Sequence, residues 1–250
     1  MLDRITPVIL TRNEEPNIGR TLAQLAWAGE VVLIDSGSTD ATVPIARLFP
    51  NVRVFERPFD SHAAQWSYGV AQASTEWVLT LDADYFVSEA FVRELASLQP
   101  DPEIAGYEAA FTYAIGGRLL RASLYPPRPV LLRCGMFTFY QDGHTQRVRA
   151  TGPLRRLGAR IVHDDRKDLR NFLARQKIYM RAEALKLRAT PFRRLPWTGR
   201  LRRLRVVAPL AVLIHTLVIK GAILDGRAGL HYARERFLAE LLLSRELFRR

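Results

Sequence analysis

Short apolar runs alternate with helical stripes along the first hundred residues. Four runs that end at polar loops predict buried strands: Ile5–Leu10, Val31–Ile34, Val52–Phe55 and Trp77–Leu81. The segments between them and just after them predict helices: Pro16–Ala26, Ala41–Leu48, His62–Ala73 and Glu89–Leu98. Strands that alternate with helices predict an α/β fold, in which a mostly parallel central sheet carries helices on both faces.

The pattern changes after Gly106. Tyr107–Ile115 and Arg118–Leu120 flank Gly116-Gly117, which predicts a β-hairpin. Further short strands are predicted at Val130–Arg133, Phe137–Tyr140, Gln146–Ala150 and Ala159–His163. The last third predicts a long helix at Lys167–Leu187, an apolar helix within Val206–Ile219 and an amphipathic helix at Leu230–Phe248.

Polar loops follow three of the predicted parallel strands: Thr11–Glu15, Asp35–Asp40 and Asp82–Asp84. The carboxyl ends of parallel strands meet at one edge of a sheet, where ligands bind. An acidic side chain for a base or ribose, a glycine loop and a metal-binding pair together suit a nucleoside diphosphate. No G-x-G-x-x-G follows the first strand, and no G-x-x-x-x-G-K-[ST] loop occurs, which argues against a dinucleotide enzyme, a kinase and a nucleoside triphosphatase.

The pair Asp82 and Asp84 is the strongest single feature of this edge. Side chains two residues apart in an extended segment point the same way, so both carboxylates can face one hard cation. Magnesium or manganese takes such oxygen ligands and bridges to substrate phosphates. The alternative is that the two aspartates only end the strand and start a turn.

The net charge of +12 predicts a polyanionic partner, either nucleic acid or an anionic membrane surface. The basic residues concentrate after Arg147, beside the apolar run, and no RNA-binding aromatic motif is visible, so we expect a membrane and no nucleic acid. The run Val206–Ile219 is shorter than the roughly 20 residues that span a bilayer. An interfacial helix fits it better, and a core helix packed against the last one is the alternative.

The compartment is indicated by two further features. The single Cys134 excludes an intrachain disulfide framework, which suits a reducing cytosol. The first predicted strand follows Met1–Arg4 at once, so we expect no secretory signal.

Three segments resemble the inverting family 2 glycosyltransferases of the GT-A fold. They are T-R-N-E-E-P-N-I-G-R-T-L, V-V-L-I-D-S-G-S-T-D-A-T and W-V-L-T-L-D-A-D, in this order. The resemblance continues through Y-P-P-R-P-V-L-L-R and through I-V-H at Ile161–His163. As a whole the chain is similar to bacterial lipopolysaccharide-core glucosyltransferases, which work at the cytoplasmic face of the inner membrane as peripheral or monotopic proteins.

This resemblance implies a Rossmann-like GT-A domain over residues 1–188, with a nucleotide-binding half (1–105) and an acceptor half (106–188). Residues 189–250 would form a basic, helical, membrane-associating extension. The implied donor-binding residues are Thr11, Asn13, Glu14, Asp35, Gly37, Ser38 and Asp82. Asp84, Asp82 and His163 would lie at a magnesium or manganese ion on the diphosphate, although His163 is equally apt as a structural residue.

The implied reaction moves a sugar from a nucleotide-sugar, expected to be a UDP-sugar, to a lipopolysaccharide-core or other lipid-linked acceptor with inversion. Asp142, beside Gly143 and His144, is our candidate general base. Glu108 and the pair Asp164-Asp165 compete, the pair more naturally as the N-terminal cap of the long helix.

Three other functions stay open: transfer to a polyprenyl phosphate, sensing of a sugar nucleotide without catalysis, and nucleic-acid binding. The chain also departs from the family at Gln65-Trp66-Ser67 and at Asp142–Gln146, where relatives carry an Arg/Lys-Asn pair and a His-Glu pair.

Overall fold

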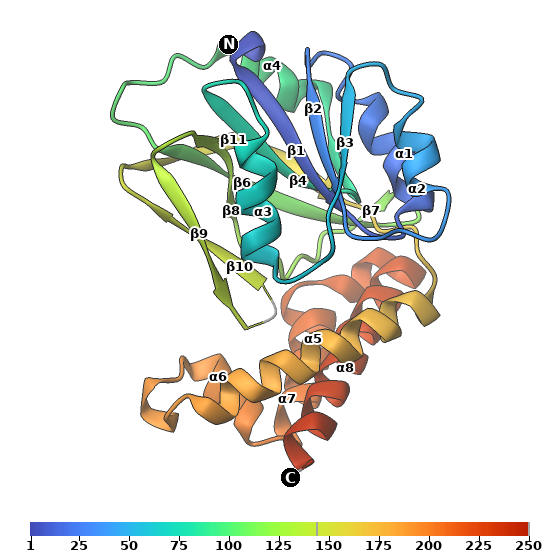
Figure 1. The fold of residues 1–250 in the computed structure, drawn as a ribbon. Coiled ribbons are helices and arrows are strands. Elements are labelled where there is room, and N and C mark those ends of the chain that lie inside the picture. Colours follow the sequence, from blue (N-terminus) through green and yellow to red (C-terminus); the bar gives the residue numbers. More distant parts are fainter. Residues whose placement is uncertain (144, 250) are drawn as a thin grey trace. The chain divides into compact units, whose positions relative to one another are not determined.

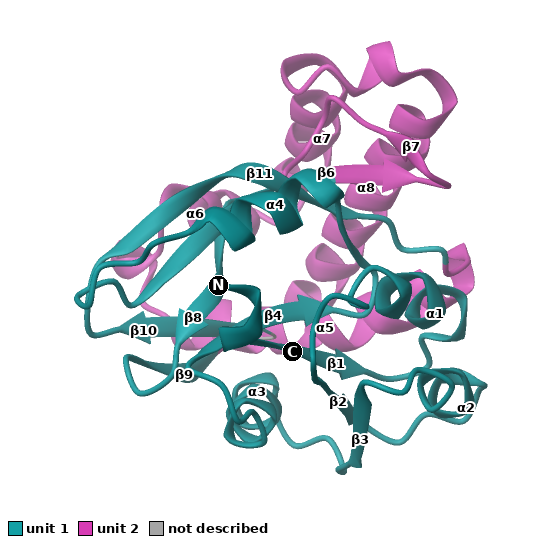
Figure 2. Cartoon of the chain, turned by 90° about the horizontal axis from the view of Figure 1, so that it is seen from above, with its two compact units in different colours: residues 1–112, 125–141, 145–166 teal, residues 113–124, 142–144, 167–250 magenta. Residues whose placement is uncertain are grey.

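The computed structural model describes residues 1–143 and 145–249, so His144 and Arg250 lie outside the described residues. The chain forms two compact units (Figure 2). Unit 1 contains residues 1–112, 125–141 and 145–166, and unit 2 contains residues 113–124, 142–144 and 167–250. The domain boundaries expected from the sequence stay a prediction.

Four parallel strands form one side of the main sheet in unit 1 (Figure 1). In spatial order they are β3 (Val52–Glu56), β2 (Val31–Asp35), β1 (Ile5–Thr11) and β4 (Trp77–Asp82). All five residues of β2 are buried, as its unbroken apolar run predicts for a strand covered on both faces. The predicted α/β sheet is confirmed in this part.

Beyond β4 the sheet continues with four more strands. The order is β8 (Arg128–Arg133), β6 (Gly106–Ile115), β11 (Leu154–His163) and β5 (Tyr85–Val87), and β7 (Arg118–Leu119) pairs with β6 in the predicted hairpin. The pairs β4–β8, β8–β6 and β11–β5 are antiparallel. A separate ribbon consists of β9 (Phe137–Asp142) and β10 (Thr145–Ala150). The sequence pattern missed β5, because three residues are too few to show a period.

Helices cover both faces of the sheet, as predicted. They are α1 (Glu15–Ala23), α2 (Thr42–Ala46), α3 (His62–Ala71) and α4 (Glu89–Ser97), after a short 3-10 turn η1 (Leu2–Arg4). Ile9 packs in the core with α1, α2 and α4, whereas the next residue along, Val8, packs with Trp66 of α3 on the opposite face. This alternation along β1 follows from the two-residue period of a strand.

Among its described residues, unit 2 has helices as its regular structure apart from its share of β6 and β7 and the last residue of β9. Its helical segments are α5 (Leu169–Ala189), η2 (Phe192–Arg194), α6 (Trp197–Arg203), α7 (Val207–Ile214), the π-helical turn η3 (His215–Ile219), η4 (Ala222–Asp225) and α8 (Gly226–Phe248). Helices α5 and α8 pack through Met180, Leu187, Leu243 and Leu247. The N-terminal cap of α5 is Asp168, whose side chain accepts from the Asn171 N–H. The expectation that Asp164-Asp165 cap this helix is therefore wrong.

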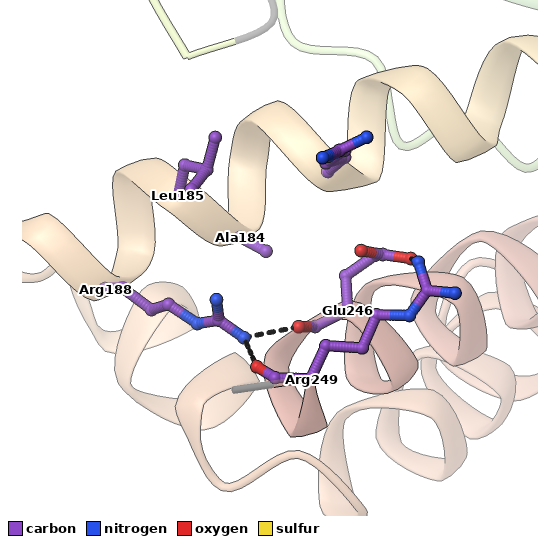
Figure 3. A pocket seen from close by; sticks show the side chains of 6 residues that line it. Ala184, Leu185, Arg188, Glu246 and Arg249 are labelled. Atoms are coloured by element: carbon purple, nitrogen blue, oxygen red, sulfur yellow. Dashed lines mark hydrogen bonds and ion pairs between the residues drawn. The ribbon is translucent and has the colours of Figure 1, made fainter.

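Arg188 joins the ends of α5 and α8. Its Nη2 donates to the backbone carbonyls of Glu246 and Arg249, as the dashed lines in Figure 3 show. These carbonyls belong to the last turn of α8, where helical acceptors lack partners of their own. Arg188 thus satisfies groups that the helix leaves open. A cavity of about 300 Å³ beside it contains none of the predicted site residues.

We predict that Gly69→Ala lowers the free energy of unfolding by about 1–2 kcal/mol. A Cβ at Gly69 on α3 would lie 2.7 Å from Val8 Cγ1 and 3.0 Å from Ile34 Cγ1, so the core has to shift. Urea unfolding measures the effect. Gly29→Ala is the matched control, because no atom lies within 4 Å of its Cβ position, and it should leave stability unchanged or slightly raised. Equal midpoints for both variants would contradict the packing argument.

Candidate active site

The register of the parallel strands brings the three polar loops to one edge of the sheet. Thr11 at the end of β1 lies opposite Asp35 at the end of β2, and Leu10 lies opposite Asp82 at the end of β4. The loops that begin at these residues therefore start side by side. The predicted gathering of the loops is confirmed.

The first two loops are hydrogen-bonded to each other through Asn13. Its backbone N–H donates to Ser38 Oγ at 2.8 Å, and its side-chain Oδ1 accepts from the Thr39 N–H at 2.8 Å. Asn13 has φ of +53°, in the left-handed region that asparagine tolerates better than most residues. Two loops 25 residues apart in the sequence thus form one polar rim.

Asp35 is almost fully buried and braces its own loop. Its Oδ2 accepts from the N–H groups of Gly37 and Ser38 at 3.0 and 2.8 Å, and its Oδ1 accepts from the Ser38 hydroxyl. Gly37 has φ of +82°, which this tight turn requires. A role of Asp35 in holding the nucleobase stays a prediction.

Gln65 supports the same loop from α3. It is fully buried, and its Nε2 donates to Ser36 Oγ and to the Arg57 carbonyl, each at 3.0 Å. The sequence marked Gln65 only as a departure from the family pattern. A buried amide that holds a loop is visible only once α3 and the β2 loop are placed together.

Thr11 and Glu14 are buried in the first loop, and their role in binding the donor stays a prediction. Glu14 Oε2 accepts from Asn17 Nδ2 at 2.8 Å. Within the part of the chain that the structure describes, the buried Thr11 Oγ1 has no hydrogen-bond partner. Buried hydroxyls are nearly always hydrogen-bonded in native proteins, so this oxygen suits a contact to a ligand.

Asp82 and Asp84 lie on a turn rather than in one extended segment. Strand β4 ends at Asp82, the chain turns at Ala83 and Asp84, and β5 begins at Tyr85. The argument that an extended strand points both side chains one way is therefore wrong. The carboxylates nevertheless interact. Burial raises the pKa of the Asp82 carboxyl, and the nearby charge of Asp84 raises it further.

His163 reaches this pair through the pairing of β11 with β5. Its register partner is Tyr85, and the backbone N–H of Asp164 donates to the Asp84 carbonyl. His163 Nε2 consequently lies 3.1 Å from Asp84 Oδ2. Burial alone would lower the pKa of the imidazole, but the charge of Asp84 and the hydrogen bond to it outweigh burial, and the pKa is raised.

Two tyrosines and an arginine complete the surroundings of the pair. The hydroxyls of Tyr85 and Tyr125 are 2.9 Å apart, and both rings lie edge-on to the His163 ring. The Arg128 guanidinium lies 4.2 Å from the centre of the Tyr125 ring. Burial, reinforced by the charge of Asp82, raises the pKa of Tyr125 to about 12, so this hydroxyl stays protonated.

The sequence alone assigned no role to Tyr85, Tyr125 or Arg128. Tyr125 and Arg128 belong to the Y-P-P-R-P stretch that resembles the family. The sequence does not show where in the fold this stretch lies. Only the fold shows that the stretch lies beside the aspartate pair.

The segment after His163 is fastened to α1. Asn17 Nδ2 donates to Asp165 Oδ1 at 3.2 Å, and Asn17 Oδ1 accepts from the Arg166 N–H. Arg20 forms an ion pair with the nearly buried Asp164 at 3.0 Å. The pair Asp164-Asp165 thus connects β11 to the helix that follows the first loop.

The side chains around the aspartate pair suit a divalent cation that is bound partly by the protein and partly by the phosphates of a substrate. In the described part of the chain, no group of three or more His, Cys, Asp and Glu side chains is arranged to hold a metal by itself. Two mutually repelling carboxylates and an imidazole nevertheless lie together, at Asp82, Asp84 and His163. A cation would relieve the repulsion between the carboxylates. Magnesium commonly binds through one or two carboxylates plus substrate phosphates, so the residues fit this kind of site.

Asp142, the candidate base, belongs to unit 2. Its Oδ1 lies 2.5 Å from Lys186 Nζ on α5, and Gly143 beside it turns with φ of +65°. The competitor Glu108 lies on β6 in unit 1. A catalytic role for either carboxylate stays a prediction.

The model of the family described as glycosyl transferase family 2 matches residues 6–149, more than half of the chain. The chain belongs to this family. The match contains the three polar loops, both aspartates of the pair and Tyr125. His163 lies beyond it.

Curated relatives cover part of the chain. The lipopolysaccharide core biosynthesis glycosyltransferase LpsC of Rhizobium meliloti is 30% identical over 112 residues, 42% of this chain and 41% of LpsC. An uncharacterized glycosyltransferase of Rickettsia typhi is 32% identical over 95 residues, 38% of this chain and 32% of that protein. The chain thus matches about two fifths or less of the length of these relatives.

Two solved structures are similar over different lengths. Residues 1–349 of TarS from S. aureus align with 98% of this chain and 91% of that chain, at 14% identity and a TM-score of 0.44. Glucosyl-3-phosphoglycerate synthase of Mycobacterium tuberculosis, in a complex with Mn²⁺, UDP and glucosyl-3-phosphoglycerate, aligns with 46% of this chain and 45% of that chain, at 24% identity and a TM-score of 0.37. Scores this low carry no argument, so the assignment rests on the family match.

We predict that His163 titrates above the ordinary histidine pKa of about 6.5 in metal-free protein. Because the folded state then binds the proton more tightly, His163 adds stability that is full below about pH 6.5 and is lost as the pH rises through its folded pKa. Asp84→Asn should lower this pKa, since it removes the charge and leaves the burial. NMR titration with chelator present measures it, and the exposed Asp3→Asn should change nothing. A wild-type pKa at or below 6.5 would contradict this account.

Proposed function

We propose that this protein is a metal-dependent inverting glycosyltransferase that uses a nucleotide-sugar, expected to be a UDP-sugar, and a lipid-borne acceptor of the lipopolysaccharide-core kind. Membership of glycosyl transferase family 2 supports the reaction class. The observation that carries the proposal is the common edge at which Thr11, Asp35 and Asp82 end three adjacent strands.

The rim formed by the first two loops would hold the nucleoside. The buried Thr11 hydroxyl and Glu14 offer a donor and acceptors to the base and ribose. The Asn13–Ser38 contact and the bonds from Gly37 and Ser38 to Asp35 hold the rim before a ligand arrives. Preorganised contacts of this kind reduce the ordering cost of binding.

Asp82, Asp84 and His163 would lie at the diphosphate. A divalent cation bound there would neutralise the negative charge that builds up on the leaving diphosphate. Tyr85 and Tyr125 pack edge-on against His163 and limit the rotation of its ring, which keeps Nε2 directed at Asp84. Phe111 packs in turn against both tyrosines. The acceptor hydroxyl would attack the anomeric carbon from the face opposite the leaving diphosphate, and this attack inverts the configuration. A carboxylate would take the proton of the hydroxyl.

The acceptor class is supported by the likeness to LpsC, whose name assigns it to lipopolysaccharide core biosynthesis. Such an acceptor would place the reaction at the cytoplasmic face of a bacterial inner membrane. Screening UDP-sugars with core saccharides and with polyprenyl phosphate tests the reaction directly. Transfer to none of them, with nucleotide-sugar binding intact, would favour a sensor.

We predict that Asp84→Asn weakens metal-dependent UDP binding and lowers the transfer rate by about a hundredfold or more, because a cation ligand is worth several kcal/mol. Calorimetric titration of UDP with manganese and with EDTA measures binding, and product formation measures the rate. Asp3→Asn makes the same chemical change at an exposed surface position and should behave like the wild type. Equal UDP affinity of the wild type in manganese and in EDTA would contradict metal dependence.

We predict that Asp142→Asn abolishes transfer to a hydroxyl acceptor while UDP-sugar binding survives. The matched variant is Lys186→Met, which removes the other half of the ion pair and keeps the carboxylate. If Asp142 is the base, Lys186→Met retains much of the activity. If Asp142 only holds α5, the two variants lose similar, small amounts of activity and stability, and the base lies elsewhere.

A further inference from the structure

A long stretch of unit 2 carries positive charge without any negative charge. Between Glu183 and Asp225 the sequence contains no Asp or Glu. Over the same stretch it contains nine basic residues: Lys186, Arg188, Arg193, Arg194, Arg200, Arg202, Arg203, Arg205 and Lys220. A solvated protein surface normally mixes both signs, so this stretch is suited to a partner that is itself negative.

The apolar side chains of α7 and η3 point outward. Val207, Leu210, Ile214 and Val218 follow one another at intervals of three, four and four residues, and they are between 47% and 67% exposed. On the other side of the same segment Ala208 and Thr216 are buried. An ordinary surface helix shows the reverse arrangement, with its large apolar stripe turned to the core.

The exposed stripe extends along the chain on both sides. Trp197 and Leu204, seven residues apart on α6 and its end, are exposed, and α6 packs against α7. Ile219, Ile223 and Leu224 are exposed at the bend between η3 and η4. We call these nine residues the apolar surface: Trp197, Leu204, Val207, Leu210, Ile214, Val218, Ile219, Ile223 and Leu224. Single exposed apolar residues are common on soluble proteins, but nine of them within one short stretch of chain point to an interaction surface.

The geometry of the segment favours shallow insertion. Within the described residues, no single helix is long and apolar enough to cross a bilayer, and the one pair of helices that passes by length and composition, Val207–Ile219 with Ala222–Phe248, is bent by 66°. A helix of the length of Val207–Ile219 extends about 20 Å, less than the roughly 30 Å of the hydrocarbon core. Gly221, with φ of +73°, lies at the bend.

The basic side chains beside the apolar surface are available to a partner. Arg193, Arg194, Arg205 and Lys220 are exposed, and among the described residues none of the four pairs with a carboxylate. Arg200 is exposed too, but its guanidinium donates to the backbone carbonyls of Leu195 and Arg193. Arg202 differs, because it pairs with the buried Glu240 and so belongs to the fold. The exposed cations are those that can reach headgroups.

We infer that the apolar surface inserts into the interfacial layer of a bilayer whose headgroups are anionic, with the exposed basic residues bound to those headgroups. Apolar insertion and headgroup attraction together are the two signals that stable peripheral anchoring needs. A second copy of the chain is a poorer occupant, because pairing two apolar surfaces would bring like charges together. This inference is independent of glycosyl transfer.

The experiment is co-sedimentation of the full chain with two kinds of vesicle, one of phosphatidylcholine alone and one with about 30 mol% phosphatidylglycerol. The two differ in the negative charge of their headgroups. We expect binding to the anionic vesicles at low salt and a large loss at high salt. The double variant Leu210→Gln/Ile214→Gln should bind at least about tenfold more weakly. The double variant Arg193→Gln/Arg194→Gln should bind the anionic vesicles more weakly, by roughly fivefold for each arginine removed.

Matched controls carry the same chemical changes on unit 1. Leu48→Gln replaces a side chain that is 79% exposed, and Arg93→Gln replaces an exposed arginine; both should bind vesicles like the wild type. UDP binding, measured on every variant, should be unchanged. Loss of UDP binding alone would count against the proposed function and leave the membrane inference standing.

Trp197 reports insertion directly. It is 74% exposed, whereas Trp66 and Trp77 are buried. Anionic vesicles should shift the tryptophan emission to the blue, lipids with brominated chains should quench it, and Trp197→Phe should remove both changes. The inference is overturned if the full chain stays in the supernatant at low salt, if the controls lose binding as the test variants do, or if the protein is instead a dimer that Leu210→Gln/Ile214→Gln dissociates.

Discussion

The placement of β1 between β2 and β4 is the constraint on which the site depends. Its residues are buried on both faces, so its register cannot slip without moving apolar side chains out of two cores at once. That register sets Thr11 beside Asp35 and Leu10 beside Asp82. Hydrophobic burial along the strands therefore determines where the polar loops meet.

The second determinant is the short pairing of β5 with β11. It joins His163 to Asp84 across 79 positions of sequence, and the contact continues through the backbone bond from Asp164 to Asp84. Asn17 and Arg20 then hold the chain after β11 against α1. The Asp84–His163 contact and the first polar loop are consequently braced by the same helix.

Much of this could be read from the sequence, because buried strands and their polar ends leave strong patterns. The four parallel strands, the Gly116-Gly117 hairpin and the gathering of three loops follow from such patterns. What failed depended on short or long-range features. The turn at Ala83-Asp84 and the three-residue β5 have no period, and the cap at Asp168 competes with two nearby aspartates of equal propensity. The contacts of Tyr125 and Gln65 exist only after distant elements have packed.

The bond between Asn13 and Ser38 has a consequence for how substitutions combine. Asn13 receives and donates hydrogen bonds across two loops, and Ser38 also bonds to Asp35. Residues that share partners in this way give mutational free energies that do not add. Effects measured at Asn13, Ser38 and Thr39 will describe one connected pair of loops, and a scan that treats the three positions as independent will count the same contacts more than once.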